Sequence, residues 1–387
     1  MRTIMPDIYA VGVSNPDLRV FDVIMETEYG TTYNAYLVKG QQVALVDICK
    51  HRFEEELLDN IREITDPAAI AYIIVNHTEP DHAGGVLAML DAAPQAVVVG
   101  TRAALNNLKE IGNRTFNEMV ATDGMELDLG GKTLRFITAP FLHWPDTMFT
   151  YAVEDHVLMS CDAFGAHYCG DVVSANLEAA QKYYFDVIMG PFKPYMIQAL
   201  NKITGLPIDV IAPSHGPIHT HNIQALLDKQ RSWCVGSTLH NAPKQVFIGY
   251  VSCYGYTRQM AETLGETLQT KGFAVVLRDL SVTPEGEVSA LIGASDAVLV
   301  GSPTVNRDVL PPVWGMLAGL SAFRDKGKPA GAFGSFGWSG EAAGMILNRL
   351  QSLGLKTLDS VCRMKLAPNE AKLAEVRAYA EQLAALL

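Results

Sequence analysis

The sequence has 387 residues, which is too many for one ordinary hydrophobic core and enough for two domains. Hydrophobic residues make up 49% and charged residues 19%, a composition typical of compact folded proteins that excludes intrinsic disorder. With 42 acidic and 30 basic residues the formal charge is −12, and no cluster of Lys or Arg predicts binding to nucleic acid.

The sequence predicts no membrane partner. One of the longest uncharged stretches, residues 210–227, is interrupted by two prolines and contains three histidines. The first seven residues include no apolar run of signal-peptide length. Six scattered cysteines, none in a C-x-x-C pair, indicate reduced and mostly buried thiols and exclude a zinc ribbon or iron–sulfur cluster held by cysteines of one chain. We therefore expect a cytoplasmic protein.

The first half reads as strands with helices outside them. Apolar runs at residues 42–48, 70–75 and 96–99 predict strands. Residues 115–161 predict successive strands, with turns at Asp123-Gly124 and Gly130-Gly131. A long helical region at 177–203 precedes a short strand at 208–212. This order predicts a layered α/β domain built around two sheets.

A polar loop directly after the strand at 70–75 carries metal-ligand side chains. Four of them fall within six positions: His77, Glu79, Asp81 and His82. Pro80 interrupts regular structure, so the loop is tight, and its side chains can converge. Three more side chains of this kind follow other apolar runs: His143, Asp162 and His215. Four imidazoles and three carboxylates are enough for two metals with Asp162 as the bridge, and they suit iron better than zinc.

The second half has a regular alternation of strands and helices. A helical segment at 222–239 ends at a predicted linker, residues 241–243, which divides the chain into domains 1–243 and 244–387. Five short strands are predicted at 246–251, 274–278, 297–300, 330–333 and 357–361, each followed by a helix-length segment. This pattern predicts a doubly wound parallel sheet with its ligand beyond the carboxyl ends of the strands.

Three loops at those strand ends carry the candidate ligand-binding residues. The first loop opens a helix, where backbone N–H groups and hydroxyls favour a phosphate, and it lacks the P-loop pattern of nucleoside triphosphatases. The other two are rich in small residues, and Trp338 is suited to cover a flat ring. The candidate residues are Ser252, Cys253, Tyr254, Gly255, Tyr256 and Thr257, then Ser302, Pro303, Thr304, Val305 and Asn306, and finally Ser335, Phe336, Gly337, Trp338, Ser339 and Gly340.

The motif in the loop after the strand at 70–75 resembles that of the metallo-β-lactamase superfamily, whose zinc members carry H-x-H-x-D-H. Here Glu79 replaces the second His, and H-x-E-x-D-H is the mark of the flavodiiron proteins within that superfamily. The resemblance implies one iron on His77, Glu79 and His143, a second on Asp81, His82 and His215, and Asp162 as the bridge. It also implies a pocket tyrosine, for which Tyr183 and Tyr184 are the candidates. The remaining histidines are expected at the surface or behind the ligands: His51, His156, His167, His219, His221 and His240.

The second half is similar to a flavodoxin domain, which implies FMN in the three loops. The resemblance thus implies an N-terminal αββα metallo-β-lactamase-like sandwich followed by a flavodoxin-like doubly wound parallel sheet. Members of the flavodiiron family reduce O2 to water, NO to N2O, or both, with electrons passing from an external donor through FMN to the diiron centre. We expect a separate rubredoxin as donor, or else a reduced deazaflavin. We also expect a head-to-tail homodimer, alone or doubled to a homotetramer.

Two other functions are compatible with parts of the sequence. A dinuclear zinc hydrolase would keep the fold and use a bridging hydroxide, with the flavodoxin-like domain as an accessory, but Glu79 argues against it. A plain electron carrier with a degenerate metal site would not need seven intact ligand-type residues. Metal analysis and the consumption of O2 or NO by the reduced protein separate the three.

Overall fold

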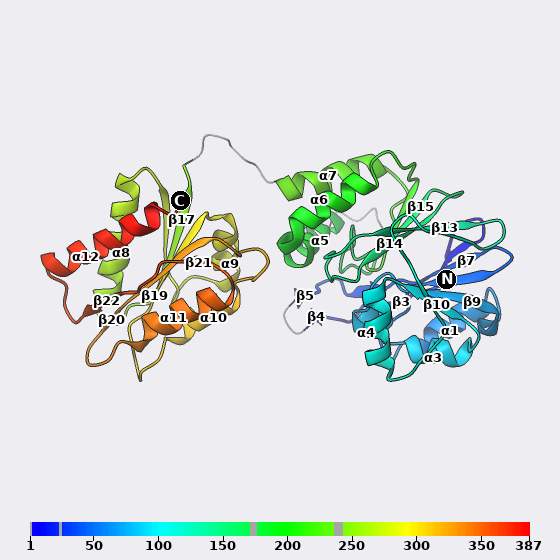
Figure 1. Ribbon diagram of the computed structural model, residues 1–387, viewed down its shortest axis with the longest axis horizontal. Coiled ribbons are helices and arrows are strands. Elements are labelled where there is room, and N and C mark those ends of the chain that lie inside the picture. The colour runs from blue at the N-terminus through cyan, green and yellow to red at the C-terminus, as the bar shows by residue number, and fades with distance from the viewer. Residues whose placement is uncertain (1, 23–24, 171–175, 236–242) are drawn as a thin grey trace. The chain divides into compact units, whose positions relative to one another are not determined.

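The computed structural model describes residues 2–22, 25–170, 176–235 and 243–387. The chain divides into two compact units, Met1–Gly236 and Ser237–Leu387 (Figure 1). Residues 241 and 242 of the predicted linker lie outside the described residues, so the boundary between 243 and 244 stays a prediction. Within the described ranges, no helix has the length and apolar character needed to cross a membrane.

The N-terminal unit contains a seven-stranded sheet with the order β1-β2-β7-β8-β9-β10-β11. Its strands are β1 Arg2–Met5, β2 Ile8–Ala10, β7 Tyr36–Lys39, β8 Val43–Val46, β9 Ile70–Ile74, β10 Val97–Gly100 and β11 Glu118–Val120. Strands β8 to β11 run parallel, and β1, β2, β7 and β8 pair antiparallel. The buried apolar runs of β8 to β10 are the ones that the sequence predicted as strands.

A second sheet has the order β12-β13-β14-β15-β16. Its strands are β12 Glu126–Asp128, β13 Thr133–Thr138, β14 Met148–Ala152, β15 Val157–Cys161 and β16 Val210–Pro213. Strands β12 to β15 form an antiparallel meander, and β16 pairs parallel to β15. Gly130 and Gly131 both have positive φ and turn the chain between β12 and β13, which explains why glycine stands there.

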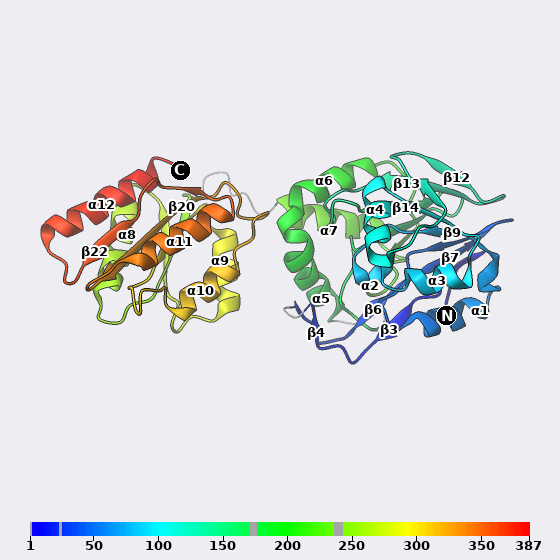
Figure 2. The same cartoon turned by 60° about the horizontal axis from the view of Figure 1, so that its bottom comes forward.

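The two sheets face each other across an apolar core and carry helices on their outer faces. Buried residues of both sheets, among them Val46, Ile74, Phe136 and Met159, pack in this inner layer. Helices α1 Glu54–Arg62, α3 Val86–Ala92 and α4 Arg102–Gly112 cover the first sheet. Helices α5 Leu177–Tyr184, α6 Lys193–Lys202 and α7 Ile223–Val235 cover the second (Figures 1 and 2). The unit is therefore the αββα sandwich that the resemblance implied.

Two features of this unit differ from the sequence predictions. The helical region predicted at 177–203 is interrupted: after α5 it widens into a π-helix, Phe185–Met189, and then tightens into a 3-10 helix, Gly190–Phe192, before α6 begins. Pro191 has no N–H to donate and breaks the helical ladder there. Strands β1, β2 and β7 were not predicted, and neither were the short strands β3 Val13–Asn15, β4 Val20–Phe21, β5 Met25–Glu26 and β6 Thr31–Tyr33, because segments of two to four residues carry little readable periodicity.

The C-terminal unit is a parallel sheet with the order β18-β17-β19-β20-β21, in which β22 also pairs with β20. Its strands are β17 Gln245–Tyr250, β18 Ala274–Asp279, β19 Ala297–Gly301, β20 Pro329–Phe336, β21 Lys356–Thr357 and β22 Cys362–Lys365. Its helices are α8 Tyr256–Thr270, α9 Glu285–Ala294, α10 Pro311–Ala318, α11 Glu341–Ser352 and α12 Glu370–Ala384. They lie on both faces of the sheet, as in flavodoxin-like folds (Figure 1).

The fifth predicted strand of this unit, 357–361, was wrong in its bounds. Two short strands, β21 and β22, flank residues 358–361 instead. Asp359 and Ser360 are exposed there, and such residues seldom occur inside strands.

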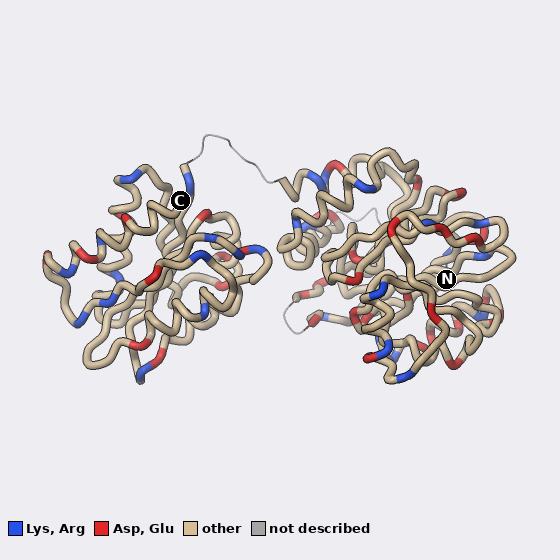
Figure 3. The backbone as a smooth tube through the Cα atoms, viewed as in Figure 1, with Lys and Arg blue, Asp and Glu red and all other residues tan. Residues whose placement is uncertain are grey.

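Lys and Arg are interspersed with Asp and Glu along the described parts of both units, with no basic stretch (Figure 3).

Candidate functional site

The loop after β9 is fixed in place by buried polar contacts before it reaches the ligand-type residues. Asn76 donates from its backbone N to Asp47 Oδ1 over 2.8 Å and from Nδ2 to Asp47 Oδ2 over 2.9 Å. The hydroxyl of Thr150, on β14 of the other sheet, donates to Asn76 Oδ1 over 2.7 Å. These bonds tie the strand end to both sheets. Helix α2, Pro80–Ala83, then begins with Pro80, where a missing N–H costs nothing.

One group of four side chains converges around Glu79. Glu79 Oε2 lies 2.8 Å from His143 Nε2 and 3.2 Å from His77 Nε2. Asp162 Oδ2 lies 3.5 Å from His77 Nε2 and 3.8 Å from His143 Nε2. One ligand atom from each of the four lies within 4.8 Å of the others. The structure therefore brings together residues that are up to 85 positions apart in the sequence, counting from 77 to 162.

A second group forms on the other side of Asp162. Asp81 Oδ2 lies 3.0 Å from His215 Nε2 and 3.3 Å from His82 Nε2. Asp162 Oδ1 lies 3.0 Å from His82 Nε2 and 3.7 Å from His215 Nε2. The two oxygens of Asp162 thus face different groups. His82 points into the second group, with its ring 4.7 Å from that of His215.

These side chains are better suited to bind metal cations than to satisfy one another by hydrogen bonds. Both carboxylate oxygens of Asp81 and Oδ2 of Asp162 are buried and accept no well-formed hydrogen bond from the described residues. Burial alone would lower the pKa of His82, but the charges of Asp81 and Asp162 outweigh it and raise that pKa to about 9. In the protein without metal, protons on His77 and His82, whose pKa values the nearby carboxylates raise, balance part of this negative charge. A bound cation takes over this balance and leaves the imidazoles neutral.

Behind the ligand-type residues lie groups that the sequence did not reveal. Asp146 Oδ1 lies 3.4 Å from His77 Nδ1, and Asp146 Oδ2 accepts the backbone N–H of Thr78 over 2.8 Å. His215 Nδ1 lies 2.6 Å from the carbonyl oxygen of Thr32. The outer nitrogen of His215 is held by this carbonyl oxygen, and that of His77 has the Asp146 carboxylate beside it at ion-pair distance, so in both rings Nε2 is the atom left for a metal. No motif marks Asp146 or Thr32, although Asp146 follows His143 by only three residues.

Of the two candidate tyrosines, the structure brings only Tyr184 to the site. Its buried hydroxyl donates to Asp162 Oδ1 over 3.3 Å, and its ring lies 6.1 Å from that of His215. Tyr183 is 43% exposed, and its hydroxyl accepts the backbone N–H of Glu26 over 3.3 Å. Neighbouring residues of a helix point about 100° apart, which explains the separation.

We expect Tyr184→Phe to lower the O2 or NO turnover that the resemblance implies about tenfold, because the Asp162 carboxylate loses a hydrogen-bond donor. Steady-state consumption of O2 and NO by the iron-loaded variant measures this effect. Tyr183→Phe is the matched control and should keep wild-type turnover. Equal losses in the two variants would contradict the role of the Tyr184 hydroxyl.

The remaining histidines divide between surface and interior. His51 is exposed and His156 is half-buried, and they lie beside Glu54 and Asp209, at 2.6 and 2.9 Å. His221 is exposed, and His240 lies outside the described residues. His167 and His219 are buried. Burial, with the nearby charge of His215, lowers the pKa of His167 to about 3, so this ring is neutral.

The three predicted flavin loops meet at one end of the C-terminal sheet. Residues 252–255 connect β17 to α8, residues 302–306 follow β19, and β20 ends at Phe336 before the loop 337–340. Thr257 and Ser335 share a hydrogen bond of 2.8 Å between their hydroxyls. Thr304 donates its backbone N–H to Ser335 O over 3.0 Å, and its hydroxyl accepts the N–H of Ala342 over 3.2 Å. Direct contacts therefore join the second loop to residues at the ends of the elements that flank the third, and one of these residues, Ser335, also contacts Thr257 beside the first loop.

These loops have the features that an FMN cradle needs. Ser252 Oγ is buried and makes no hydrogen bond within the described residues. A Cβ on Gly334 would approach Ser302 O to 2.1 Å, so only glycine allows the loops to come this close. Tyr254 and Trp338 are 86% and 77% exposed, which is unusual for large rings and suits side chains that cover a flat ligand.

We expect Ser252→Asp to release FMN, because a carboxylate placed among the loop amides repels a phosphate with little added volume. Ser252→Asn, which has the same shape without the charge, is the matched control and should retain most of the flavin. Absorbance of the purified proteins at flavin wavelengths measures occupancy. Full flavin occupancy in Ser252→Asp would show that the phosphate lies elsewhere.

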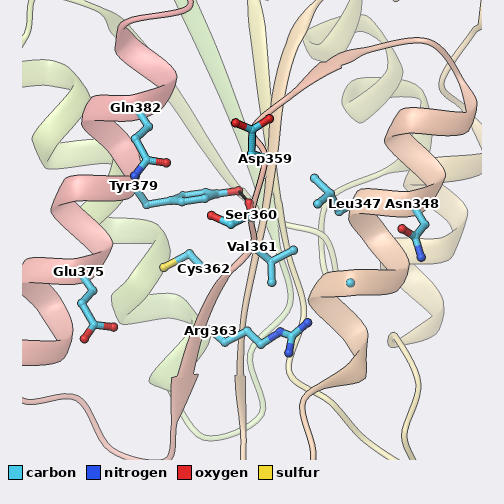
Figure 4. Close-up of a pocket in the computed structure, with 11 residues that line it drawn as sticks. Leu347, Asn348, Asp359, Ser360, Val361, Cys362, Arg363, Glu375, Tyr379 and Gln382 are labelled. Atoms are coloured by element: carbon cyan, nitrogen blue, oxygen red, sulfur yellow. Dashed lines mark hydrogen bonds between the residues drawn. The ribbon is translucent and has the colours of Figure 1, made fainter.

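A separate groove of about 730 Å³ lies beside the edge strand β22, between α11 and α12 (Figure 4). Tyr379 crosses it, donates its hydroxyl to Ser360 O over 3.0 Å and accepts the N–H of Ala332 over 3.0 Å. None of the predicted flavin-loop residues lines this groove, and none of the ligand-type residues of the N-terminal unit does.

Comparisons with known proteins cover both units. A family model described as ODP family beta lactamase matches residues 31–216, and a flavodoxin model matches residues 248–379. The Flavo-diiron protein FprA2 of Clostridium acetobutylicum is 38% identical over 98% of each chain. The nitric oxide reductase of Moorella thermoacetica is 38% identical over 91% of this chain and 90% of its own.

Solved structures share the whole architecture. The rubredoxin oxygen:oxidoreductase of Desulfovibrio gigas superposes with a TM-score of 0.75 at 29% identity, over 100% of this chain and 98% of its own. The flavodiiron protein of Giardia intestinalis gives a TM-score of 0.71 at 29% identity, over 99% and 95%.

Proposed function

This chain belongs to the flavodiiron protein family of oxidoreductases, and we propose that it reduces O2 to water, NO to N2O, or both. The family membership and the flavodoxin unit imply FMN and a diiron centre as its cofactors. The proposal extends to this chain what the names of its relatives state for them, an oxygen oxidoreductase and a nitric oxide reductase.

The observation that carries the proposal is the shared carboxylate of Asp162. One of its oxygens faces the group around Glu79, and the other faces Asp81, His82 and His215. Two donor groups of nitrogen and oxygen atoms joined by one carboxylate suit a pair of iron ions. We propose His77, Glu79 and His143 for one iron, Asp81, His82 and His215 for the other, and Asp162 as the bridge.

The residues around these ligands have separate tasks. The Thr32 carbonyl holds the outer nitrogen of His215 and fixes the direction of its ring, and the Asp146 carboxylate lies beside the outer nitrogen of His77 at ion-pair distance. The hydroxyl of Tyr184 donates a hydrogen bond to Asp162 Oδ1 and so helps to hold the bridging carboxylate in place. Phe164, 2% exposed, and Phe21, 3% exposed, add apolar walls to the core around the site. When bound, the irons and FMN supply the electron transfer, and the chain supplies position and a dry environment.

The electron donor, the assembly and the location are further proposals. The name of the Desulfovibrio gigas relative supports a rubredoxin as donor, with a reduced deazaflavin as the second choice. We propose the head-to-tail homodimer, alone or doubled to a homotetramer, as the active form. All six cysteines are free, which supports a reducing compartment such as the cytoplasm.

The dinuclear zinc hydrolase is not favoured. The carboxylate of Glu79 lies between His77 and His143, where a zinc site of this superfamily would offer a third imidazole. Two of the relatives that span both units are named as a nitric oxide reductase and a rubredoxin oxygen:oxidoreductase.

The test combines metal analysis with turnover. Protein purified after growth with iron should contain about two irons and one FMN per chain, and it should consume O2 or NO only when a reductant is supplied. Rubredoxin and a reduced deazaflavin serve as alternative donors in the same assay. Zinc-loaded protein that hydrolyses substrates without any reductant would contradict the proposal.

A further inference from the structure

His167 is a buried histidine beside the second ligand group that the proposed function does not use. Its side chain is 5% exposed and lies in the loop that follows Asp162. Its ring lies 4.9 Å from the ring of His215, 5.0 Å from that of Tyr184 and 4.4 Å from that of Phe21. The ring is thus part of the wall of the metal site, on the side of Asp81, His82 and His215.

The hydroxyl of Thr31 decides which nitrogen of His167 carries the proton. His215 Nδ1 lies 2.6 Å from Thr32 O, and because a carbonyl oxygen only accepts, Nδ1 is the donor. Thr31 Oγ1 lies 3.3 Å from the same N–H and therefore faces it as an acceptor. The Thr31 hydroxyl hydrogen then has two acceptors within reach, Thr32 O at 3.3 Å and His167 Nδ1 at 3.0 Å, and the shorter contact favours His167 Nδ1.

This arrangement leaves His167 with an unused donor. A neutral imidazole that accepts a hydrogen bond at Nδ1 carries its proton on Nε2. His167 Nε2 is buried and has no hydrogen-bond partner within the described residues. A buried N–H without an acceptor is unfavourable and rare in folded proteins, so an acceptor is expected when the site is loaded.

We propose that His167 Nε2–H donates a hydrogen bond to the small ligand that binds at the Asp81, His82 and His215 side of the metal centre. The surrounding rings of Phe21, Tyr184 and His215 restrict this acceptor to a small molecule, such as a diatomic, a hydroxide or a triatomic anion. This inference rests on the proposed function, because it requires a metal at that group.

Azide titration of the oxidised, iron-loaded protein tests the inference without any turnover. Azide is a small anion whose binding to ferric iron is followed by visible absorption. We expect His167→Phe, which keeps a ring of similar size and removes the N–H, to raise the azide dissociation constant on the order of tenfold. His167→Gln, which restores a donor, should stay within about threefold of the wild type. His156→Gln changes a half-buried histidine that pairs with Asp209 outside the site, and it should leave the constant unaltered.

Iron content is measured in each variant before titration. If His167→Phe loses iron, Thr31→Val replaces it, since Val keeps the shape of Thr and removes the hydroxyl that directs the ring. An unchanged azide constant in an iron-replete His167→Phe or Thr31→Val protein would overturn the inference. Equal weakening in His167→Phe and His167→Gln would indicate packing instead of donation and would also overturn it. Wild-type protein that held no iron would contradict the proposed function itself, and this result is visible before any variant is made.

Discussion

Glu79→His should lower reductase activity by at least about a hundredfold and shift metal occupancy from iron toward zinc. Glu79 Oε2 lies 2.8 Å from His143 Nε2 and 3.2 Å from His77 Nε2, so it is central to the first donor group. Replacing it with imidazole removes one negative charge and one hard oxygen donor from this group. Iron that cycles through its oxidised state needs that charge more than zinc does.

The experiment measures iron and zinc per chain and the consumption of O2 and NO, after growth with both metals. Glu79→Gln separates the loss of charge from the gain of a nitrogen donor, and it should lose iron without gaining zinc. Glu110→His, on the exposed face of α4, controls for the added histidine. Undiminished turnover in Glu79→His would contradict the assignment of iron to this group.

The ligand-type residues could be predicted because each follows an apolar run or belongs to the H-x-E-x-D-H motif. Asp162 directly follows β15, and His215 lies two residues beyond β16; these strands are parallel neighbours, so their carboxyl ends meet at one edge of the sheet. The H-x-E-x-D-H spacing placed four more side chains in one tight loop. Hydrophobic runs likewise predicted most of both sheets, since buried strands are continuous apolar segments.

The groups behind the ligands could not be predicted in the same way. Thr31 contacts His167 across 136 positions of sequence and His215 across 184. Thr31 stands in a strand of three residues, which has no periodicity to read. Polar residues of this kind are common at surfaces, and only the fold shows that these are buried and paired. The choice between Tyr183 and Tyr184 likewise depended on how α5 is turned about its axis.

A chain without metal ligands and a chain without flavin should recover activity when they form a mixed dimer. In the head-to-tail dimer that we propose, the FMN of one chain serves the irons of its partner, and two-fold symmetry repeats this arrangement twice. The variants are His77→Ala with Glu79→Ala, which should hold FMN and little iron, and Ser252→Asp, which should hold iron and little FMN. Each parent homodimer lacks one cofactor throughout and should not turn over.

Coexpression with two different affinity tags, followed by purification over both, isolates the mixed dimers. Each mixed dimer has one intact FMN and one intact metal centre, and these belong to different chains. With cross-chain transfer the mixed dimer should reach about half the wild-type rate, because one of two symmetric pairs is complete. Ser252→Asn in place of Ser252→Asp keeps flavin in both chains and sets the upper reference for the same preparation. If electrons instead pass within one chain, no chain of the mixed dimer has both cofactors, and the mixed dimer should be as inactive as its parents. An inactive mixed dimer with the expected iron and flavin content would therefore reject the cross-chain route.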